Sequence, residues 1–152
     1  MLKVKRLSQN AYIPVRSSRG AAGYDLKTPE DITLRPGLNR VPLKISIELP
    51  PNTYGRIACR SSLASKEFSV EAGVVDEDYR GEIIVLLRWH HPQSKRTRDV
   101  TIPYSRGHKI AQLIVTPYLT PSVTETTLSY SDRGGGGFGS TDVAVAFKPY
   151  HD

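Results

Sequence analysis

Short runs rich in Val, Ile, Thr and Tyr, separated by 11 prolines and 12 glycines, are the feature that most constrains the fold of this chain. Such a pattern is typical of many short β-strands joined by turns. Residues 61–66 alone favour a helix, because Ser61 and Ser62 are good N-terminal residues and directly follow a predicted strand. The sequence therefore predicts an all-β antiparallel sandwich, jelly roll or closed barrel with one short helix. Strands are expected over residues 3–7, 23–27, 31–34, 39–49, 54–60, 82–88, 100–102 and 109–116.

A length of 152 residues is sufficient to bury a core within one domain. No repeat and no linker divides the chain, so we expect a single domain over residues 1–152. Within it, we expect a β core over 1–129, a flexible glycine-rich tail segment over 130–142 and a C-terminal extension over 143–152. Alternating Val143, Val145 and Phe147 would suit an added strand, a docking segment or a loose tail.

The N-terminus and the charge pattern bound the location and the class of partner. The first ten residues alternate apolar and basic side chains and lack the apolar segment of a signal peptide, and no apolar run is long enough to span a bilayer. The expected location is therefore cytoplasmic or nuclear, without a membrane partner. Cys59 is the only cysteine, which excludes an intrachain disulfide. The net charge of +6 attracts polyanions, and the basic run at 95–98 is interpreted as a solvated loop rather than as a nucleic-acid site.

Residues 73–82, GVVDEDYRGE, predict a hairpin in which an acidic turn joins two strands. One interpretation is structural, because aspartates are favoured in turns by their own side-chain hydrogen bonds to the backbone. The other is catalytic, because the Asp76 carboxylate at a turn could accept a proton from a water molecule. Tyr79 could offer its ring to a sugar or a base, or could simply pack. From the residues alone, both interpretations stay open.

Four other segments carry residue types that suit a nucleotide. Residues 60–64, RSSLA, place an arginine and two serines where a short helix should begin, which favours anion binding or an ordinary capped turn. Residues 133–141, RGGGGFGST, could form a closing lid or a plain linker. Asp25 and Gln112 lie on predicted strands, where polar residues are commonly structural.

In type, order and spacing, five segments together resemble the five motifs of the trimeric dUTP diphosphatases. They are AAGYDL (21–26), GRIACRSSLASK (55–66), AGVVDEDYRGE (72–82), RGHKIAQLI (106–114) and RGGGGFGSTD (133–142). The resemblance implies a jelly-roll-like distorted β-barrel and a homotrimer with active sites shared between chains. It also implies hydrolysis of dUTP to dUMP and pyrophosphate with Mg²⁺, which limits uracil incorporation into DNA and supplies dUMP for thymidylate synthesis. Phosphoryl chemistry of this kind needs charge neutralisation and alignment rather than a covalent nucleophile.

The resemblance also implies a role for each matched residue. Asp76 would hold the water that attacks the α-phosphorus, and Tyr79 would lie against the deoxyribose and reject a 2′-hydroxyl. Asp25 would contact the hydration shell of a magnesium ion held mainly by the triphosphate. The uracil edge would be read by Gly73, Val74, Val75 and Ile84. The phosphates would be bound by Arg60, Ser61, Ser62, Gln112 and Arg133, with Phe138 covering the uracil and Gly139, Ser140 and Thr141 completing the contacts.

Three positions depart from the family pattern: Ser62 where glycine is usual, His108 where aspartate is common, and Asp142 where glycine is usual. Two rival functions follow from the same fold. A dCTP deaminase would release ammonia, although the Gly-rich tail and the DEDYRGE turn argue against it. A non-catalytic binding or regulatory protein is the second rival, against which the intact motifs argue.

Overall fold

The computed structural model describes residues 1–92 and 99–142. Its backbone divides into two units, Met1–Leu119 and Thr120–Asp152, which are described separately. The predicted basic loop at 95–98 and the predicted extension at 143–152 lie outside the described residues, and the proposed division at residue 129 stays a prediction. Within the part of the chain that is described, no helix has the length and apolar character needed to cross a membrane.

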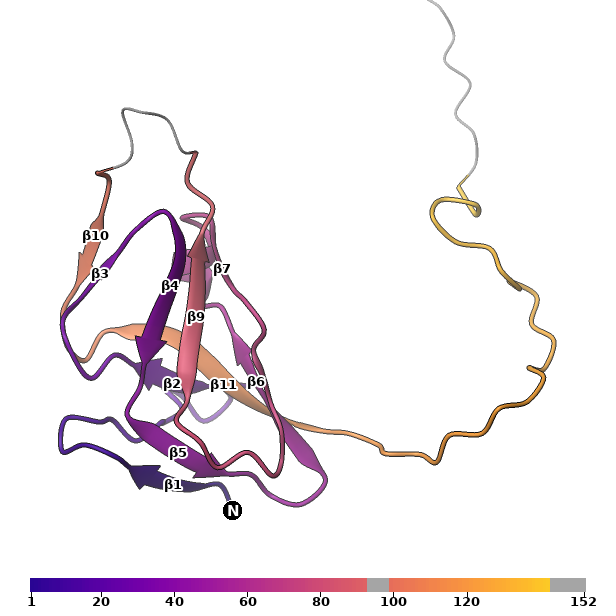
Figure 1. The fold of residues 1–152 in the computed structure, drawn as a ribbon, viewed down its shortest axis with the longest axis horizontal. Coiled ribbons are helices and arrows are strands. Elements are labelled where there is room, and N and C mark those ends of the chain that lie inside the picture. The colour runs from indigo at the N-terminus through magenta and orange to yellow at the C-terminus, as the bar shows by residue number, and fades with distance from the viewer. Residues whose placement is uncertain (93–98, 143–152) are drawn as a thin grey trace, which may run out of the picture. The chain divides into compact units, whose positions relative to one another are not determined.

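The first unit is an all-β, jelly-roll-like barrel with one short helix, which confirms the predicted fold class (Figure 1). The elements are β1 (Lys3–Arg6), β2 (Tyr24–Lys27), β3 (Ile32–Leu34), β4 (Gly37–Pro42), β5 (Ile45–Glu48), β6 (Thr53–Ala58), α1 (Ser61–Ala64), β7 (Phe68–Val70), β8 (Val74–Val75), β9 (Ile84–Trp89), β10 (Ile102–Tyr104) and β11 (Lys109–Pro117).

Antiparallel pairing groups these strands into four small sheets. The largest has the order β2-β11-β6-β8, and a three-stranded sheet has the order β4-β9-β7. Two further pairs, β1 with β5 and β10 with β3, extend the barrel wall. Because neighbours in space are distant in sequence, the strands repeatedly cross from one sheet to another, as a jelly roll requires.

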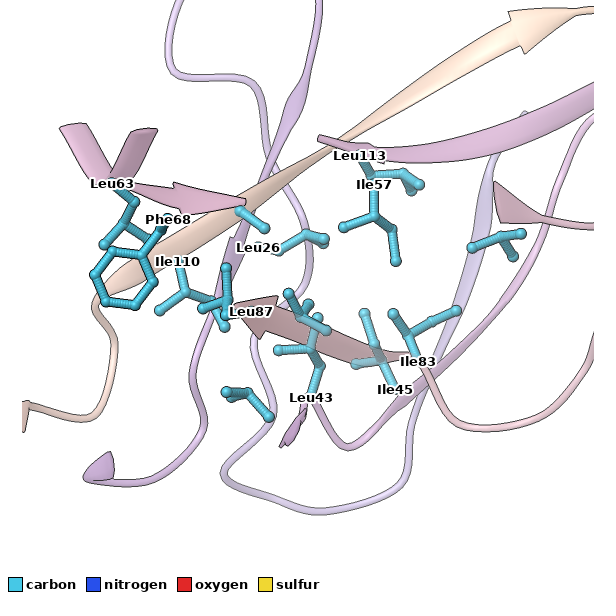
Figure 2. Close-up of a cluster of buried hydrophobic side chains, with 14 of the residues drawn as sticks. Leu26, Leu43, Ile45, Ile57, Leu63, Phe68, Ile83, Leu87, Ile110 and Leu113 are labelled. Carbon is cyan, nitrogen blue, oxygen red and sulfur yellow. The ribbon is translucent and has the colours of Figure 1, made fainter. Parts of the chain in front are cut away.

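The core lies between the sheets and is built by alternation along the strands. Burial follows the pattern buried, half-buried along β5 and the same period along β9, as expected for strands with one face on the core. Figure 2 shows side chains from both main sheets pointing toward one another, with Leu63 of α1 and Phe68 of β7 closing one end. Full burial of a side chain such as Leu87 contributes about 1.5–3 kcal/mol.

The predicted single strand over 39–49 is wrong, because the chain turns a corner between β4 and β5. Lys44 adopts a φ of 58°, in the left-handed region, and its N–H donates to the Glu82 carboxylate at 3.0 Å. A contact distant in sequence thus stabilises a conformation that lysine rarely adopts on its own. Strand β7 was not predicted, since three residues are too few to show a period.

A β-bulge in β11 changes which residues share a face. Gln112 pairs with Asp25 of β2 and Lys109 pairs with Lys27, although the register shifts by one residue in between. Residues 109 and 112 would lie on opposite faces of a regular strand, because side chains alternate. The extra residue, Ile110, is fully buried, and Lys109 is thereby brought onto the face that carries Asp25 and Gln112.

Candidate active site

A pocket of about 180 Å³ opens where the two main sheets separate. One wall is β8 of the four-stranded sheet, and the other comes from β7 and β9 of the three-stranded sheet. Gly73 has a φ of 85°, and a Cβ there would lie 2.7 Å from the Ile57 carbonyl oxygen. Only glycine fits, so the backbone of this segment can line the pocket closely. The lining includes Ile57, Val70, Gly73, Val74, Val75, Asp76, Tyr79, Glu82, Ile83 and Ile84.

Asp76 begins a turn at the mouth of this pocket. The Tyr79 N–H donates to the Asp76 carbonyl oxygen at 3.1 Å, and the Asp76 side chain is exposed. The prediction that strands on either side of this turn form a hairpin is wrong. Strand β8 pairs with β6, whereas β9 pairs with β4 and β7. The turn therefore bridges two sheets, which is why a pocket rather than a continuous ladder lies behind it.

Tyr79 is held over Gly81 at the side of the pocket. Its hydroxyl donates to the Glu82 carbonyl oxygen at 2.9 Å, and a Cβ at Gly81 would lie 2.5 Å from that hydroxyl. Its exposed fraction of 44% leaves ring surface free for a ligand. The ring orientation is thus fixed within the segment itself, independently of the carboxylate three residues earlier.

The same turn is fastened on its outer side by the residue after Asp76. The Glu77 carboxylate accepts hydrogen bonds from the Asn52 backbone N–H at 3.1 Å and from the Tyr118 hydroxyl at 3.2 Å. Arg80 donates to the Glu77 carbonyl oxygen at 2.7 Å and to the Glu48 carboxylate at 3.2 Å. Partial burial, and then the hydrogen bond to Glu77, raise the pKa of Tyr118 above its ordinary value.

A second group of polar side chains lies on the face of β2 and β11 near the start of α1. The buried Asp25 carboxylate is 3.2 Å from the Lys109 ammonium and 4.0 Å from the Arg60 guanidinium. Arg60 also donates to the Lys109 carbonyl oxygen at 3.1 Å, and Gln112 donates to the Cys59 carbonyl oxygen at 3.2 Å. These contacts assemble two cations and an amide around one carboxylate, a suitable arrangement for phosphate oxygens.

The start of α1 adds two serines to this second group. Ser61 and Ser62 are exposed, while Leu63 is buried and anchors the helix to the core. No side chain caps the helix at Arg60, so the amides of the first turn have no such partner. The Ser62 departure from glycine places a small exposed side chain there without disturbing the backbone.

His108 lies next to the second group, with its ring 4.2 Å from that of Tyr104. Partial burial, together with the positive charges of Arg60 and Lys66, lowers its pKa below the ordinary value. The neutral form of the ring is accordingly favoured near Arg60 and Lys66.

Asp25 is the candidate metal contact, and its surroundings fit such a role. Its Oδ2 atom is buried and, despite the nearby Lys109 ammonium, makes no hydrogen bond within the described residues. Among those residues, no group of three or more His, Cys, Asp or Glu side chains is placed to hold a metal ion. A metal at Asp25 would therefore need further ligands from elsewhere, such as phosphate oxygens and water.

The tail unit carries the fifth predicted segment. Arg133 donates to the Gly136 carbonyl oxygen at 2.7 Å, and Phe138 is fully exposed with a φ of 53°. Gly139 has a φ of 86°, and Asp142 donates its N–H back to the Gly139 carbonyl oxygen at 3.0 Å. Ser140 and Thr141 are exposed in the same turn. These residues expose an arginine, an aromatic ring and backbone amides.

The sequence-predicted residues thus form three groups: the pocket with Asp76, the polar face with Asp25, and the tail. Glu77 belongs to the group with Asp76 and Lys109 to the group with Asp25, and neither residue was predicted. The bulge that redirects Lys109 leaves no signal in the sequence, and Glu77 resembled an ordinary member of an acidic turn.

The chain is similar in sequence and in fold to known proteins. The dUTPase family profile matches residues 9–142. The chain is 45% identical to the deoxyuridine 5'-triphosphate nucleotidohydrolase of Paramecium bursaria Chlorella virus 1, covering 93% of this chain and 98% of that protein. It is 44% identical to the enzyme of the same name from Oryza sativa subsp. japonica, covering 94% and 81% respectively. The solved structure of Staphylococcus bacteriophage 80alpha dUTPase with dUpNHpp has a TM-score of 0.81 at 28% identity, covering 94% of this chain and 99% of that one. The chain belongs to the dUTPase family.

Proposed function

We propose that this protein is a dUTP diphosphatase, which hydrolyses dUTP to dUMP and pyrophosphate. The observation that carries the proposal is the pocket beside Asp76, lined by the Gly73 backbone and by the Tyr79 ring. Related proteins carry the name of this activity, and the phage 80alpha enzyme has been solved with dUpNHpp. By this reaction the protein would limit uracil incorporation into DNA and supply dUMP for thymidylate synthesis.

In this proposal, the pocket selects the base and the sugar. Backbone groups from Gly73 to Val75, with Ile84 opposite, bind the uracil edge, since these residues line the pocket and Gly73 has no side chain to cover its backbone. Tyr79, fixed by its hydrogen bond to Glu82, lies against the deoxyribose and leaves no room for a 2′-hydroxyl. Selectivity of this steric kind acts against UTP rather than against other deoxynucleotides.

Asp76 is the proposed general base. Its exposed carboxylate at the pocket mouth can accept a proton from a water molecule directed at the α-phosphorus. The bond from the α-phosphorus to the bridging oxygen then breaks, and pyrophosphate leaves. No covalent enzyme intermediate is needed, in keeping with phosphoryl chemistry that depends on alignment and charge stabilisation.

Phosphate binding is assigned to Arg60, Ser61, the Ser62 amide and Gln112, with the tail residues Arg133, Phe138, Gly139, Ser140 and Thr141 closing over the substrate. A magnesium ion bound to the triphosphate would supply charge neutralisation, and Asp25 would accept hydrogen bonds from its water ligands. The buried Oδ2 atom of Asp25 supports this assignment, because it lies near the Lys109 ammonium but makes no hydrogen bond within the described residues. A dUTPase variant from phage phi11 of S. aureus, solved at a TM-score of 0.73 and 25% identity, is described as coordinating a structural Mg(II) ion.

We further propose a homotrimer in which the pocket, the phosphate-binding face and the tail of one site come from different chains. The trimer follows from the family resemblance, and its stoichiometry can be measured directly by light scattering.

The proposed activity is tested by measuring pyrophosphate release from dUTP, dTTP, dCTP and UTP with Mg²⁺, together with ammonia release from dCTP. We expect pyrophosphate from dUTP alone at appreciable rate. Ammonia from dCTP without pyrophosphate from dUTP would instead identify a deaminase, and no turnover of any of the four would leave a binding protein.

A further inference from the structure

Glu77 differs from the other acidic residues of its turn in the contacts that its side chain makes. Its neighbours in sequence, Asp76 and Asp78, are exposed, whereas the Glu77 side chain turns back toward the barrel. There it meets two donors from different parts of the chain: the loop after β5, through the Asn52 N–H, and the end of β11, through the Tyr118 hydroxyl. A carboxylate that accepts two hydrogen bonds at one oxygen atom is held more strictly than one in solvent.

Both donors are themselves fixed. Asn52 has a φ of 61° and accepts a hydrogen bond from the Tyr118 N–H at 3.2 Å, so the two donors are tied to each other. The Tyr118 ring packs edge-on against Tyr54 at a centroid distance of 6.0 Å. The Glu77 carboxylate is therefore bound to a preassembled corner and not to two independent mobile groups.

The backbone of Glu77 is fastened as well. Arg80 bridges the Glu77 carbonyl oxygen and the Glu48 carboxylate of β5, and Glu48 also pairs with Lys3 of β1. These contacts hold the peptide between Glu77 and Asp78, one residue beyond Asp76. Tyr79, by contrast, has its own anchor at Glu82 within the segment. The Tyr79 and Glu77 side chains thus have separate hydrogen-bond partners, although Arg80 also donates to the Tyr79 carbonyl oxygen at 3.3 Å and the Tyr79 N–H donates to the Asp76 carbonyl oxygen.

We propose that Glu77 is a positioning residue for Asp76, and that its contacts with Asn52 and Tyr118 fix the direction of the Asp76 carboxylate toward the attacking water. The inference rests on the proposed function, since it assigns Asp76 as the proton acceptor. A small misplacement of a general base costs much of its rate, because proton transfer requires hydrogen-bond reach to the water. Nucleotide binding, which depends on the Gly73 backbone and Tyr79, is left largely intact.

The first test compares kcat with the Kd for dUpNHpp in two variants that remove contacts of Glu77. Glu77→Ala should lower kcat about tenfold or more and Tyr118→Phe about threefold, the factors expected for the loss of charge-assisted and single hydrogen bonds. The Kd for dUpNHpp should stay within about twofold of wild type in both. Tyr54→Phe is the matched control, because it removes a hydroxyl from the other ring of the same pair and leaves the Glu77 contacts in place. Glu77→Gln, which keeps an acceptor oxygen, should recover most of the lost rate.

The second test asks whether Glu77 acts through Asp76. In an Asp76→Asn background, adding Glu77→Ala should reduce the residual rate no further, since residues that act as a unit are not additive. A second loss of about tenfold in that background would overturn the proposal, as would a wild-type kcat in both Glu77→Ala and Tyr118→Phe. Where Glu77→Ala does not fold, Tyr118→Phe decides: a threefold loss of kcat at an unchanged Kd supports the proposal, and a wild-type kcat overturns it.

Activity of the wild-type protein distinguishes a failure of the proposed function from a failure of the positioning role. A wild-type protein that releases no pyrophosphate from dUTP refutes the proposed function, and the positioning role falls with it. If the wild type is active but Glu77→Ala and Tyr118→Phe change the Kd for dUpNHpp as much as kcat, only the positioning role is refuted. Glu77 would then support the whole pocket.

Discussion

Replacing Gly73 by alanine should destabilise the protein, because two separate costs meet at this position. A side chain at a φ of 85° costs about 1–2 kcal/mol in left-handed strain. The new Cβ would also lie 2.7 Å from the Ile57 carbonyl oxygen, and that backbone is tied to Gly73 by an Ile57 N–H to Gly73 carbonyl bond of 2.7 Å. Neither partner can move away without breaking the pairing of β6 with β8, so overpacking adds about 1–3 kcal/mol.

The expected loss is therefore about 2–5 kcal/mol in the free energy of unfolding, which lowers Tm by about 10 °C or more for a unit of this size. Thermal and urea unfolding at one fixed protein concentration would measure it, since assembly makes Tm depend on concentration. Gly20→Ala is the matched control, because nothing lies within 4 Å of a Cβ there. A Gly73→Ala protein that melts within about 2 °C of this control would refute the steric reasoning.

Four further outcomes are expected. Asp76→Asn should lower kcat by orders of magnitude while dUpNHpp still binds, whereas Asp78→Asn on the same turn should change kcat little; equal losses would contradict the role of Asp76. Deletion of residues 134–152 should lower kcat for dUTP clearly while changing Tm little, and unchanged kinetics would show that the tail has no part in the mechanism. Gly23→Ala would place a Cβ 2.3 Å from the Gln112 Oε1 atom, so KM for dUTP should rise several-fold, and an unaltered KM would exclude Gln112 from binding. The pKa of Tyr118 is raised from 10.0, so the neutral hydroxyl is favoured in the folded state beside Glu77, Asp76 and Asp78. Its contribution to stability is therefore present below pH 10 and is lost as pH rises through the higher pKa of the folded state. Tyr118→Phe should abolish this loss in unfolding curves measured at alkaline pH.

The fold class could be predicted from the sequence because each strand carries its own local signal. Alternation along β9 and the punctuation by glycine and proline need no knowledge of partners. The corner at Lys44 could not be predicted in this way, because its left-handed φ is stabilised by Glu82, 38 positions away. The pairing of β8 with β6 is equally non-local, which is why an apparent hairpin proved to be a bridge between sheets.

The candidate site divides along the same line. Asp76, Tyr79 and Arg60 lie in short segments whose composition left their roles open, and they could be grouped only because five segments together resemble the family motifs in type, order and spacing. Lys109 lies beside Asp25 only because a bulge reverses the alternation of β11. Glu77 is distinguished from Asp78 only by what it contacts, and contact is a property of the folded chain.

The bulge at Ile110 also bears on how this chain can vary over time. A substitution in the first half of β11 changes one side chain, but removal of the Ile110 codon would close the bulge, leave Lys109 opposite Lys27, and take a fully buried side chain out of the core. A strand of the same length without the bulge would instead place Lys109 on the opposite face from Gln112, and Asp25 would lose its ammonium partner. A change in the length of this strand should consequently be tolerated less well than a replacement at one of its half-exposed positions.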